Sequence, residues 1–356
     1  MKILITGICG MVASHLADLC IEKGHEVYGT YRWQEDNSNI KHLLNNPKFN
    51  LIPMNLNDLS NCIGAIAKAK PDAISHLAAE SYVGDSFDHP EETIRTNTLG
   101  TLNILEAIRI LREIGDIIIE NKLKNLNEKL RFNPIIHICS SSEVYGLVTK
   151  DLIPIKENCR FNPSNPYAVG KIGADMLALM YYTNYGLKTI RTRMFTHTSG
   201  RRKMLSAEVN FARQIANFEN INKKELIKFD LGIKYIHNEF ILKHGNLNSL
   251  RTWAHVEDAI NAYYLILTKP VKFGEVYNIG GLDSRTIGEV LDYLISLSPL
   301  KDKIKKQLDN SLLRKYDVTL QLPDISKFQA DYPEWKAKWK FENIMKDVLE
   351  GQRNII

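Results

Sequence analysis

The sequence contains few cysteines, and no two of them have the spacing of a paired site. There are five cysteines in 356 residues, and none belongs to a Cys-x-x-Cys motif. An odd number without such spacing argues against a disulfide framework. We therefore expect reduced thiols, a cytoplasmic location and no bound metal.

Long apolar runs and dense basic runs are also missing. No stretch approaches the roughly 18 apolar residues of a membrane span, and no charged segment followed by a long apolar one opens the chain. The formal net charge is only +5, and no Lys/Arg block carries interleaved aromatic residues. These absences predict no signal peptide, no membrane contact and no nucleic-acid partner. The composition, 44% hydrophobic and 24% charged, is typical of a globular protein.

A short apolar segment, residues 2–6, is followed by a glycine turn and a helical pattern to about residue 23. A strand, a glycine turn and a helix in this order indicate a dinucleotide-binding site. The glycines let backbone N–H groups approach a pyrophosphate at the helix N-terminus. The alternative is an ordinary turn between a strand and a helix. The residues assigned to cofactor binding here are Gly7, Cys9, Gly10, Met11 and Val12.

The second predicted strand, residues 26–31, ends without a carboxylate. In NAD-binding proteins an acidic residue commonly ends this strand and holds the ribose 2′-hydroxyl. Here Arg32 follows, and its guanidinium suits the 2′-phosphate of NADP. NADP is therefore the predicted cofactor, and NAD is less favoured. The alternative is a surface Arg32, with Glu35 and Asp36 reaching the ribose.

Four more strands are predicted, at residues 49–54, 71–79, 134–139 and 189–195, and the run at 134–139 is mostly apolar. Their alternation with helical patterns predicts an α/β fold, a Rossmann-type doubly wound parallel sheet with a smaller mixed C-terminal lobe. His76 is interpreted as a packed interior histidine. A helix is expected to open at Asn97, which is interpreted as a helix-end or backbone-bonding residue. Further cofactor contacts are assigned beside the ends of the third and fourth strands, to Asn55, Leu56, Leu77, Ala78, Ala79 and Ser81.

A polar triplet that includes Ser141 and Glu143 follows the strand at 134–139, at the strand end where open α/β sheets bind ligands. Tyr167 and Lys171 stand four residues apart where a helix begins, so their side chains share one face. An ammonium beside a phenol favours the phenolate, which predicts a lowered pKa for Tyr167. Alone, such a pair is more often a solvated helix face.

Together these residues resemble the extended short-chain dehydrogenase/reductases that act on nucleotide sugars. Longer stretches are most similar to the GDP-mannose 4,6-dehydratases, and the resemblance extends over roughly residues 1–340. It implies an NADP-dependent hydro-lyase with a GDP-linked substrate, working as a homodimer or homotetramer. The most similar stretches are residues 140–146, 195–202, 245–255 and 314–318.

The resemblance also implies a reaction. Tyr167, as phenolate, takes the proton from the sugar O4 while C4 passes hydride to the nicotinamide, and Ser141 hydrogen-bonds O4. Lys171 holds the nicotinamide ribose. Glu143 removes the C5 proton and protonates the departing C6 hydroxyl, after which hydride returns to C6. The resemblance assigns His197 and Arg202 to the cofactor, and Arg251 and Arg314 to the substrate.

Several positions differ from the family pattern and leave the sugar open, including a GDP-linked heptose or N-acetylated hexose. They are Trp33, Asn55, Glu80, Glu92, Ser141 and Thr196. The alternatives on the same scaffold are a C4 epimerase, a C4 reductase, a decarboxylase and a non-catalytic NADP-binding regulator. Residues 1–195 are predicted to form the NADP-binding domain, with residues near 246–265 returning to it. Residues 196–350 are predicted to form an interleaved nucleotide-sugar lobe.

Overall fold

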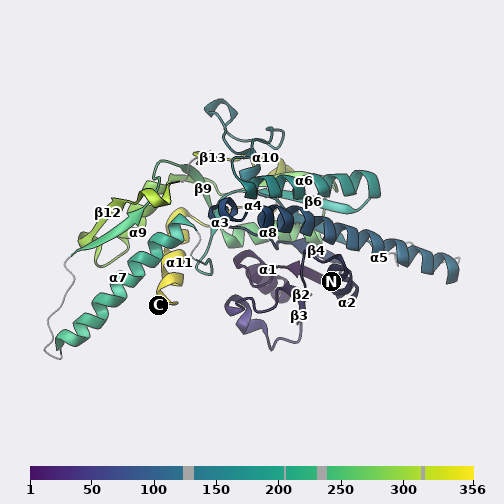
Figure 1. The fold of residues 1–356 in the computed structure, drawn as a ribbon, viewed down its shortest axis with the longest axis horizontal. Coiled ribbons are helices and arrows are strands. Elements are labelled where there is room, and N and C mark those ends of the chain that lie inside the picture. The colour runs from purple at the N-terminus through teal and green to yellow at the C-terminus, as the bar shows by residue number, and fades with distance from the viewer. Residues whose placement is uncertain (123–131, 204–205, 231–238, 314–316) are drawn as a thin grey trace.

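A computed structural model describes residues 1–122, 132–203, 206–230, 239–313 and 317–356 (Figure 1). Its centre is a seven-stranded parallel sheet in the order β10-β6-β5-β4-β1-β2-β3. The predicted doubly wound α/β fold is thereby confirmed. The strands are β1 (Lys2–Thr6), β2 (Glu26–Tyr31), β3 (Phe49–Pro53), β4 (Ala73–His76), β5 (Ile135–Cys139), β6 (Lys188–Met194) and β10 (Val276–Ile279).

Helices cover both faces of this sheet, so most residues of its strands are buried, polar ones included. In β1, Ile3 and Ile5 pack in one core with α1 and α8, while Leu4 points to the opposite core. The chain builds β1, β2 and β3 outward and then crosses back to β4. The crevice at that reversal is where doubly wound sheets bind ligands. The helices on the sheet include α1 (Met11–Glu22), α2 (Leu59–Ala69), α5 (Gly100–Lys122), α6 (Pro166–Tyr185) and α8 (Val256–Thr268).

Two details of the sheet differ from the sequence predictions. The fourth strand ends at His76, because the backbone N–H groups of Leu77 and Ala78 donate to the Thr6 hydroxyl at 3.0 Å each. The seventh strand, β10, was not predicted at all. It lies between Gly274 and Gly280, so the flanking glycines were the available signal.

The predicted helix start at Asn97 is wrong. The helical stretch begins earlier, with α4 (Pro90–Ile94), and passes through a π-helical segment at Arg95–Leu99 before α5. Asn97 bonds to backbone, as expected. Its side-chain oxygen accepts from the N–H of Glu80 at 2.9 Å, and its amide donates to the Glu80 carbonyl at 3.0 Å. Asn97 therefore fixes the loop that follows β4.

A second group of elements lies at one end of the molecule, on the left of Figure 1. Its helices α7, α9 and α11 share a core that includes Phe211, Leu291 and Ile344. A second sheet consists of β7, β9, β11 and β13. The segment predicted to return to the first domain, residues 246–265, supplies β9 to this second sheet and α8 to a face of the first. The division into two domains at residue 195 stays a prediction. The elements are β7 (His197–Thr198), α7 (Ala207–Asp230), β8 (Phe240–His244), β9 (Leu250–His255), β11 (Asp283–Thr286), α9 (Ile287–Ser296), β12 (Ile304–Leu308), β13 (Leu320–Gln321) and α11 (Phe341–Arg353).

Two segments to which the sequence assigns no role, residues 112–131 and 218–248, are partly described. The polar segment 112–131 continues α5 as a helix to Lys122, and residues 123–131 lie outside the described part. The segment 218–248 contains the end of α7 and the strand β8, and residues 231–238 again lie outside. Among the described residues, no helix combines the length and the apolar character needed to cross a membrane. Two further short helices are α3 (Val83–Asp88) and α10 (Ser326–Asp331).

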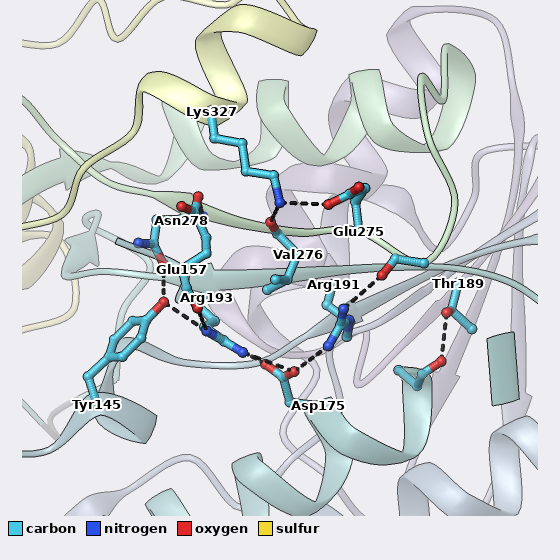
Figure 2. A network of polar contacts seen from close by, with 12 residues as sticks. Tyr145, Glu157, Asp175, Thr189, Arg191, Arg193, Glu275, Val276, Asn278 and Lys327 are labelled. Atoms are coloured by element: carbon cyan, nitrogen blue, oxygen red, sulfur yellow. Dashed lines mark hydrogen bonds and ion pairs between the residues drawn. The ribbon is translucent and has the colours of Figure 1, made fainter. Parts of the chain in front are cut away.

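A buried ion-pair network fixes α6 against β6 (Figure 2). Asp175 on α6 is 0% exposed and accepts from the guanidinium groups of Arg191 and Arg193 on β6, at 2.9 Å each. Arg193 also donates to the Tyr145 hydroxyl at 3.0 Å, and Tyr145 donates to Asn278 on β10 at 2.7 Å. This network anchors the helix whose first turns carry Tyr167 and Lys171.

Replacing Asp175 by asparagine is expected to lower the free energy of unfolding by about 3–5 kcal/mol, because two buried guanidinium groups lose their counter-charge. Denaturant unfolding measures the change. Glu91→Gln is the control, since its pair with Arg95 is exposed and such pairs contribute about 0–1 kcal/mol. Equal losses in the two variants would contradict the role given to the network.

Candidate active site

The first glycine turn has the geometry of a phosphate-binding loop. Gly7 has a φ of +68°, and a Cβ there would stand 2.8 Å from the Ala78 Cα, so only glycine fits. Gly10 is the N-cap of α1, and no side chain caps that helix end. The first residues of α1, Met11 and Val12, therefore present backbone N–H groups and the positive end of the helix dipole. These features fit the pyrophosphate of a dinucleotide.

Other residues assigned to the cofactor line the same edge of the sheet. The Thr6 hydroxyl holds the chain after β4 beside the glycine turn, which places Ala78, between Leu77 and Ala79, against Gly7. Cys9 is buried in the turn, and burial raises the pKa of its thiol to about 11, so it is a packed thiol. Two further residues of the set follow β3, where Asn55 accepts from the Asn57 N–H at 3.0 Å and Leu56 is buried.

His76 is the interior histidine that the sequence indicated. Its ring nitrogens contact the hydroxyls of Thr6 at 2.9 Å and Thr101 at 3.1 Å. Burial lowers the pKa of His76 to about 3, so the ring is neutral. The ring supports the end of β4, and both of its nitrogens have hydrogen-bond partners within the protein.

Arg32 is paired with two acidic residues. Its guanidinium contacts the Glu80 carboxylate at 2.8 Å, and its backbone N–H donates to Glu35 at 3.1 Å. The Arg32 side chain is 63% exposed, so the pair with Glu80 is weak and open to exchange. Glu80 also borders a cavity of about 130 Å³, lined by Glu80, Tyr82, Asp85, His89, Glu92 and Thr93. Two of the positions that differ from the family pattern, Glu80 and Glu92, thus meet at one cavity. Ser81 follows Glu80 in the same loop.

The four residues predicted to be catalytic come together beyond the end of β5. Ser141, Glu143, Tyr167 and Lys171 are each at most 9% exposed. The Ser141 oxygen accepts from the backbone N–H of Glu143 at 3.2 Å, and its hydroxyl hydrogen-bonds Tyr167. Lys171 donates to the Cys139 carbonyl at 2.9 Å, and its Nζ lies 5.9 Å from the centre of the Tyr167 ring. A hydroxyl, a phenol, an ammonium and a carboxylate therefore share one buried site.

The predicted lowering of the Tyr167 pKa is wrong. Burial raises this pKa well above its usual value, and the hydrogen bond from Ser141 and the charge of Arg202 oppose the rise only in part. Burial also lowers the pKa of Lys171. The spacing in the sequence indicated the neighbouring charge but not the loss of solvent around it, and here the loss of solvent is the larger effect.

Both carboxylate oxygens of Glu143 are held by amides that the sequence did not single out. Asn165, the N-cap of α6, donates to Oε2 at 3.0 Å, and Gln321 on β13 donates to Oε1 at 2.8 Å. Arg251, assigned to the substrate, stands 3.9 Å from Oε1. Asn165 could have been found as the N-cap before a proline in the first helical turn. No local pattern indicates Gln321.

Two basic residues assigned to the cofactor lie next to each other after β6. His197 contacts the Phe195 carbonyl through Nδ1 at 3.0 Å, and Arg202 donates to the His197 carbonyl at 2.6 Å. Burial and the charge of Arg202 lower the pKa of His197 to about 4, so the ring is neutral. The charge of Arg202 also acts on Tyr167, which places both residues near the catalytic group. Arg314 lies outside the described residues.

Comparison with known proteins agrees with this geometry. A family model described as GDP-mannose 4,6 dehydratase matches residues 4–348. A GDP-mannose 4,6-dehydratase from Yersinia enterocolitica is 35% identical, in an alignment that covers 98% of this chain and 93% of that protein.

Two solved structures are similar in fold. One is that of RMD from Pseudomonas aeruginosa complexed with NADPH, with a TM-score of 0.73, 22% identity and full coverage of both chains. The other is dTDP-glucose 4,6-dehydratase from Bacillus anthracis in complex with NAD. Its TM-score is 0.71 at 20% identity, and the match covers 99% of this chain and 97% of that one.

Proposed function

The chain belongs to the GDP-mannose 4,6-dehydratase family, and on that premise we propose that it converts a GDP-linked hexose to the 4-keto-6-deoxy sugar nucleotide. The observation that carries the proposal is the convergence of Ser141, Glu143 and Tyr167 in one buried site. The Tyr167 phenol interacts with the Ser141 side chain, and the charge of the Glu143 carboxylate acts on the same phenol. GDP-mannose is the first substrate to test, and a GDP-heptose is a related one.

The residues divide the proton transfers between them. A bound nicotinamide would supply the hydride acceptor and donor of the reaction and, when oxidised, a positive charge in the site. Tyr167 accepts the O4 proton, and Ser141 orients O4. Lys171, held by the Cys139 carbonyl, binds the nicotinamide ribose and keeps a positive charge near the phenol. Glu143 takes the C5 proton and delivers it to the departing C6 hydroxyl.

The carboxylate favours dehydration over the other reactions of this scaffold. Epimerisation or reduction at C4 does not require removal of the sugar's C5 proton, so those reactions need no carboxylate base at this point. Here both oxygens of Glu143 are held in the site by Asn165 and Gln321. Incubating the protein with a panel of GDP-, UDP-, CDP- and dTDP-sugars tests the proposal. A product lighter by one water supports it. Loss of CO₂ would indicate a decarboxylase, and stoichiometric use of reduced cofactor a reductase.

We also propose NADP as the cofactor, with Arg32 at the 2′-phosphate. The exposed pair between Arg32 and Glu80 must exchange for the phosphate, and Glu80 adds a negative charge at that point. Replacing Glu80 by glutamine is therefore expected to tighten NADPH binding about two- to fivefold, in line with the strength of an exposed pair.

Fluorescence titration of the sugar-free protein measures this affinity, and NADH, which has no 2′-phosphate, is the matched control ligand. Its affinity is expected to stay the same in the Glu80→Gln variant. An equal gain for NADPH and NADH would contradict the role of Glu80 and Arg32 at the 2′-phosphate.

The assembly and location are proposed as well. We propose a homodimer or homotetramer in the cytoplasm. Exposed apolar side chains on α3, α6 and the π-helical segment support self-association, namely Phe87, Leu99, Val169 and Met176. All five cysteines are free, which supports a reducing location. We further propose that residues 1–195 hold the cofactor and that the later elements hold most of the sugar nucleotide.

A further inference from the structure

We propose that Gln321 is a positioning residue for Glu143 and that it links this carboxylate to Arg251. Gln321 is 2% exposed and donates through Nε2 to Glu143 Oε1 at 2.8 Å. Its own side-chain oxygen accepts a hydrogen bond from the Arg251 guanidinium. The proposal rests on the function given above, in which Glu143 acts on C5 and C6 of the sugar.

The strand register creates this contact. β13 pairs with β9 in parallel, and Gln321 stands directly opposite Arg251. Side chains at paired positions of neighbouring strands lie on the same face of a sheet. The pairing also aims Gln321 out of the second sheet toward Glu143, which follows β5 of the first sheet. The contact therefore joins the catalytic carboxylate to an element 178 positions away.

The chemistry of the neighbours determines which way each amide faces. A guanidinium can only donate hydrogen bonds, so the oxygen of Gln321 must face Arg251 and its NH₂ group must face Glu143. Asn165 is restricted in the same way, because its oxygen accepts from the Ala168 N–H at 2.8 Å as the N-cap of α6. Glu143 thus meets an amide donor at each oxygen.

This arrangement suits a residue that begins as a base. Two donors hold the carboxylate in one orientation while it is ionised. Neither amide oxygen is available to accept the proton that Glu143 takes from C5. The proton therefore remains available for the C6 hydroxyl.

Arg251, which the resemblance assigns to the substrate, is the residue suited to its nucleotide end. Besides Gln321, it contacts the Val318 carbonyl at 3.1 Å and lies 3.9 Å from an Asp317 oxygen. A guanidinium is well suited to the oxygens of a diphosphate. Gln321 thus stands between the residue proposed to hold the substrate and the residue proposed to transfer its protons, and it aligns the two.

The test replaces Gln321 by methionine, which has a similar length and no hydrogen-bonding amide. We expect kcat to fall by about 10²-fold, the effect of a misplaced catalytic group, with KM changed by less than about threefold. Loss of a C5 deuterium label from the substrate to water should slow by the same factor. The rate of C4 oxidation in a single turnover should stay the same.

Gln214→Met is the matched control, because the Gln214 amide also joins two elements, α7 and β8. Its NH₂ group donates to the Lys243 carbonyl, and its oxygen accepts from the Lys243 N–H. It is expected to keep wild-type rates. An unchanged kcat and C5 exchange in Gln321→Met would overturn the proposal, as would an equal loss in the control or in C4 oxidation.

A crystal structure of the wild-type protein with GDP tests, without any measurement of catalysis, whether Gln321 joins Arg251 to Glu143. Gln321 bonded to both Arg251 and Glu143 supports the proposal, and Gln321 turned away from Glu143 overturns it. If the wild-type protein dehydrates no sugar nucleotide, the proposed function fails. The crystal structure still shows whether the Arg251, Gln321 and Glu143 contacts exist.

Discussion

The Tyr167→Phe variant is expected to lose activity by about 10²–10⁴-fold, the range of a general acid–base group. Phenylalanine fills the same buried space but cannot take the O4 proton, so C4 oxidation stops at the first step. Substrate binding should change little, because the variant keeps the aromatic ring and loses only a hydroxyl that bonds to Ser141 within the protein. Product formation from the sugar nucleotide, followed by mass spectrometry, gives the rate.

Tyr181→Phe is the matched control for this variant. Tyr181 lies on the same helix, is 3% exposed and donates its hydroxyl to Glu106 at 2.7 Å, away from Ser141. Its loss should affect stability and leave kcat within about twofold. Wild-type turnover by Tyr167→Phe would show that the phenol is not the base.

The Glu143→Gln variant is expected to separate oxidation from dehydration. The amide cannot accept the C5 proton, so loss of water should fall by about 10²–10⁴-fold, while C4 oxidation through Tyr167 continues. Near-ultraviolet absorbance of the reduced cofactor follows the oxidation, and product mass follows the loss of water. The expected result is a reduced cofactor that persists beside an intact C6 hydroxyl.

A buried glutamate elsewhere provides the control for this charge change. Glu219 is 5% exposed and pairs with Arg353 at 2.8 Å in the core of α7 and α11. Glu219→Gln should reduce stability and spare both steps. If Glu143→Gln forms the dehydrated product at the wild-type rate, the carboxylate has no part in the elimination.

The parts of the fold that the sequence predicted correctly are those with local signals. The apolar runs of β1, β2 and β5 and the glycine turn after β1 are each contained in a few neighbouring residues. β10 was missed because it has four residues and pairs with β6 more than 80 positions earlier in the chain. Its place in the sheet depends on tertiary packing, which no short window of sequence carries.

The same limit applies to the site. The spacing of Tyr167 and Lys171 is a property of one helix, so the sequence alone reveals it. The contacts of Glu143 with Gln321 and of Arg32 with Glu80 join residues 178 and 48 positions apart. The direction of the Tyr167 pKa shift depends on burial, which spacing does not report.

The central claim is that one pocket oxidises, dehydrates and reduces a sugar without releasing it. A GDP-hexose labelled with deuterium at C4 tests this claim most directly, with mass spectrometry of the product as the measurement. The account predicts a product lighter by one water that carries the label at C6. Loss of the label to unlabelled cofactor in solution, or a product that retains its C6 hydroxyl, would contradict it.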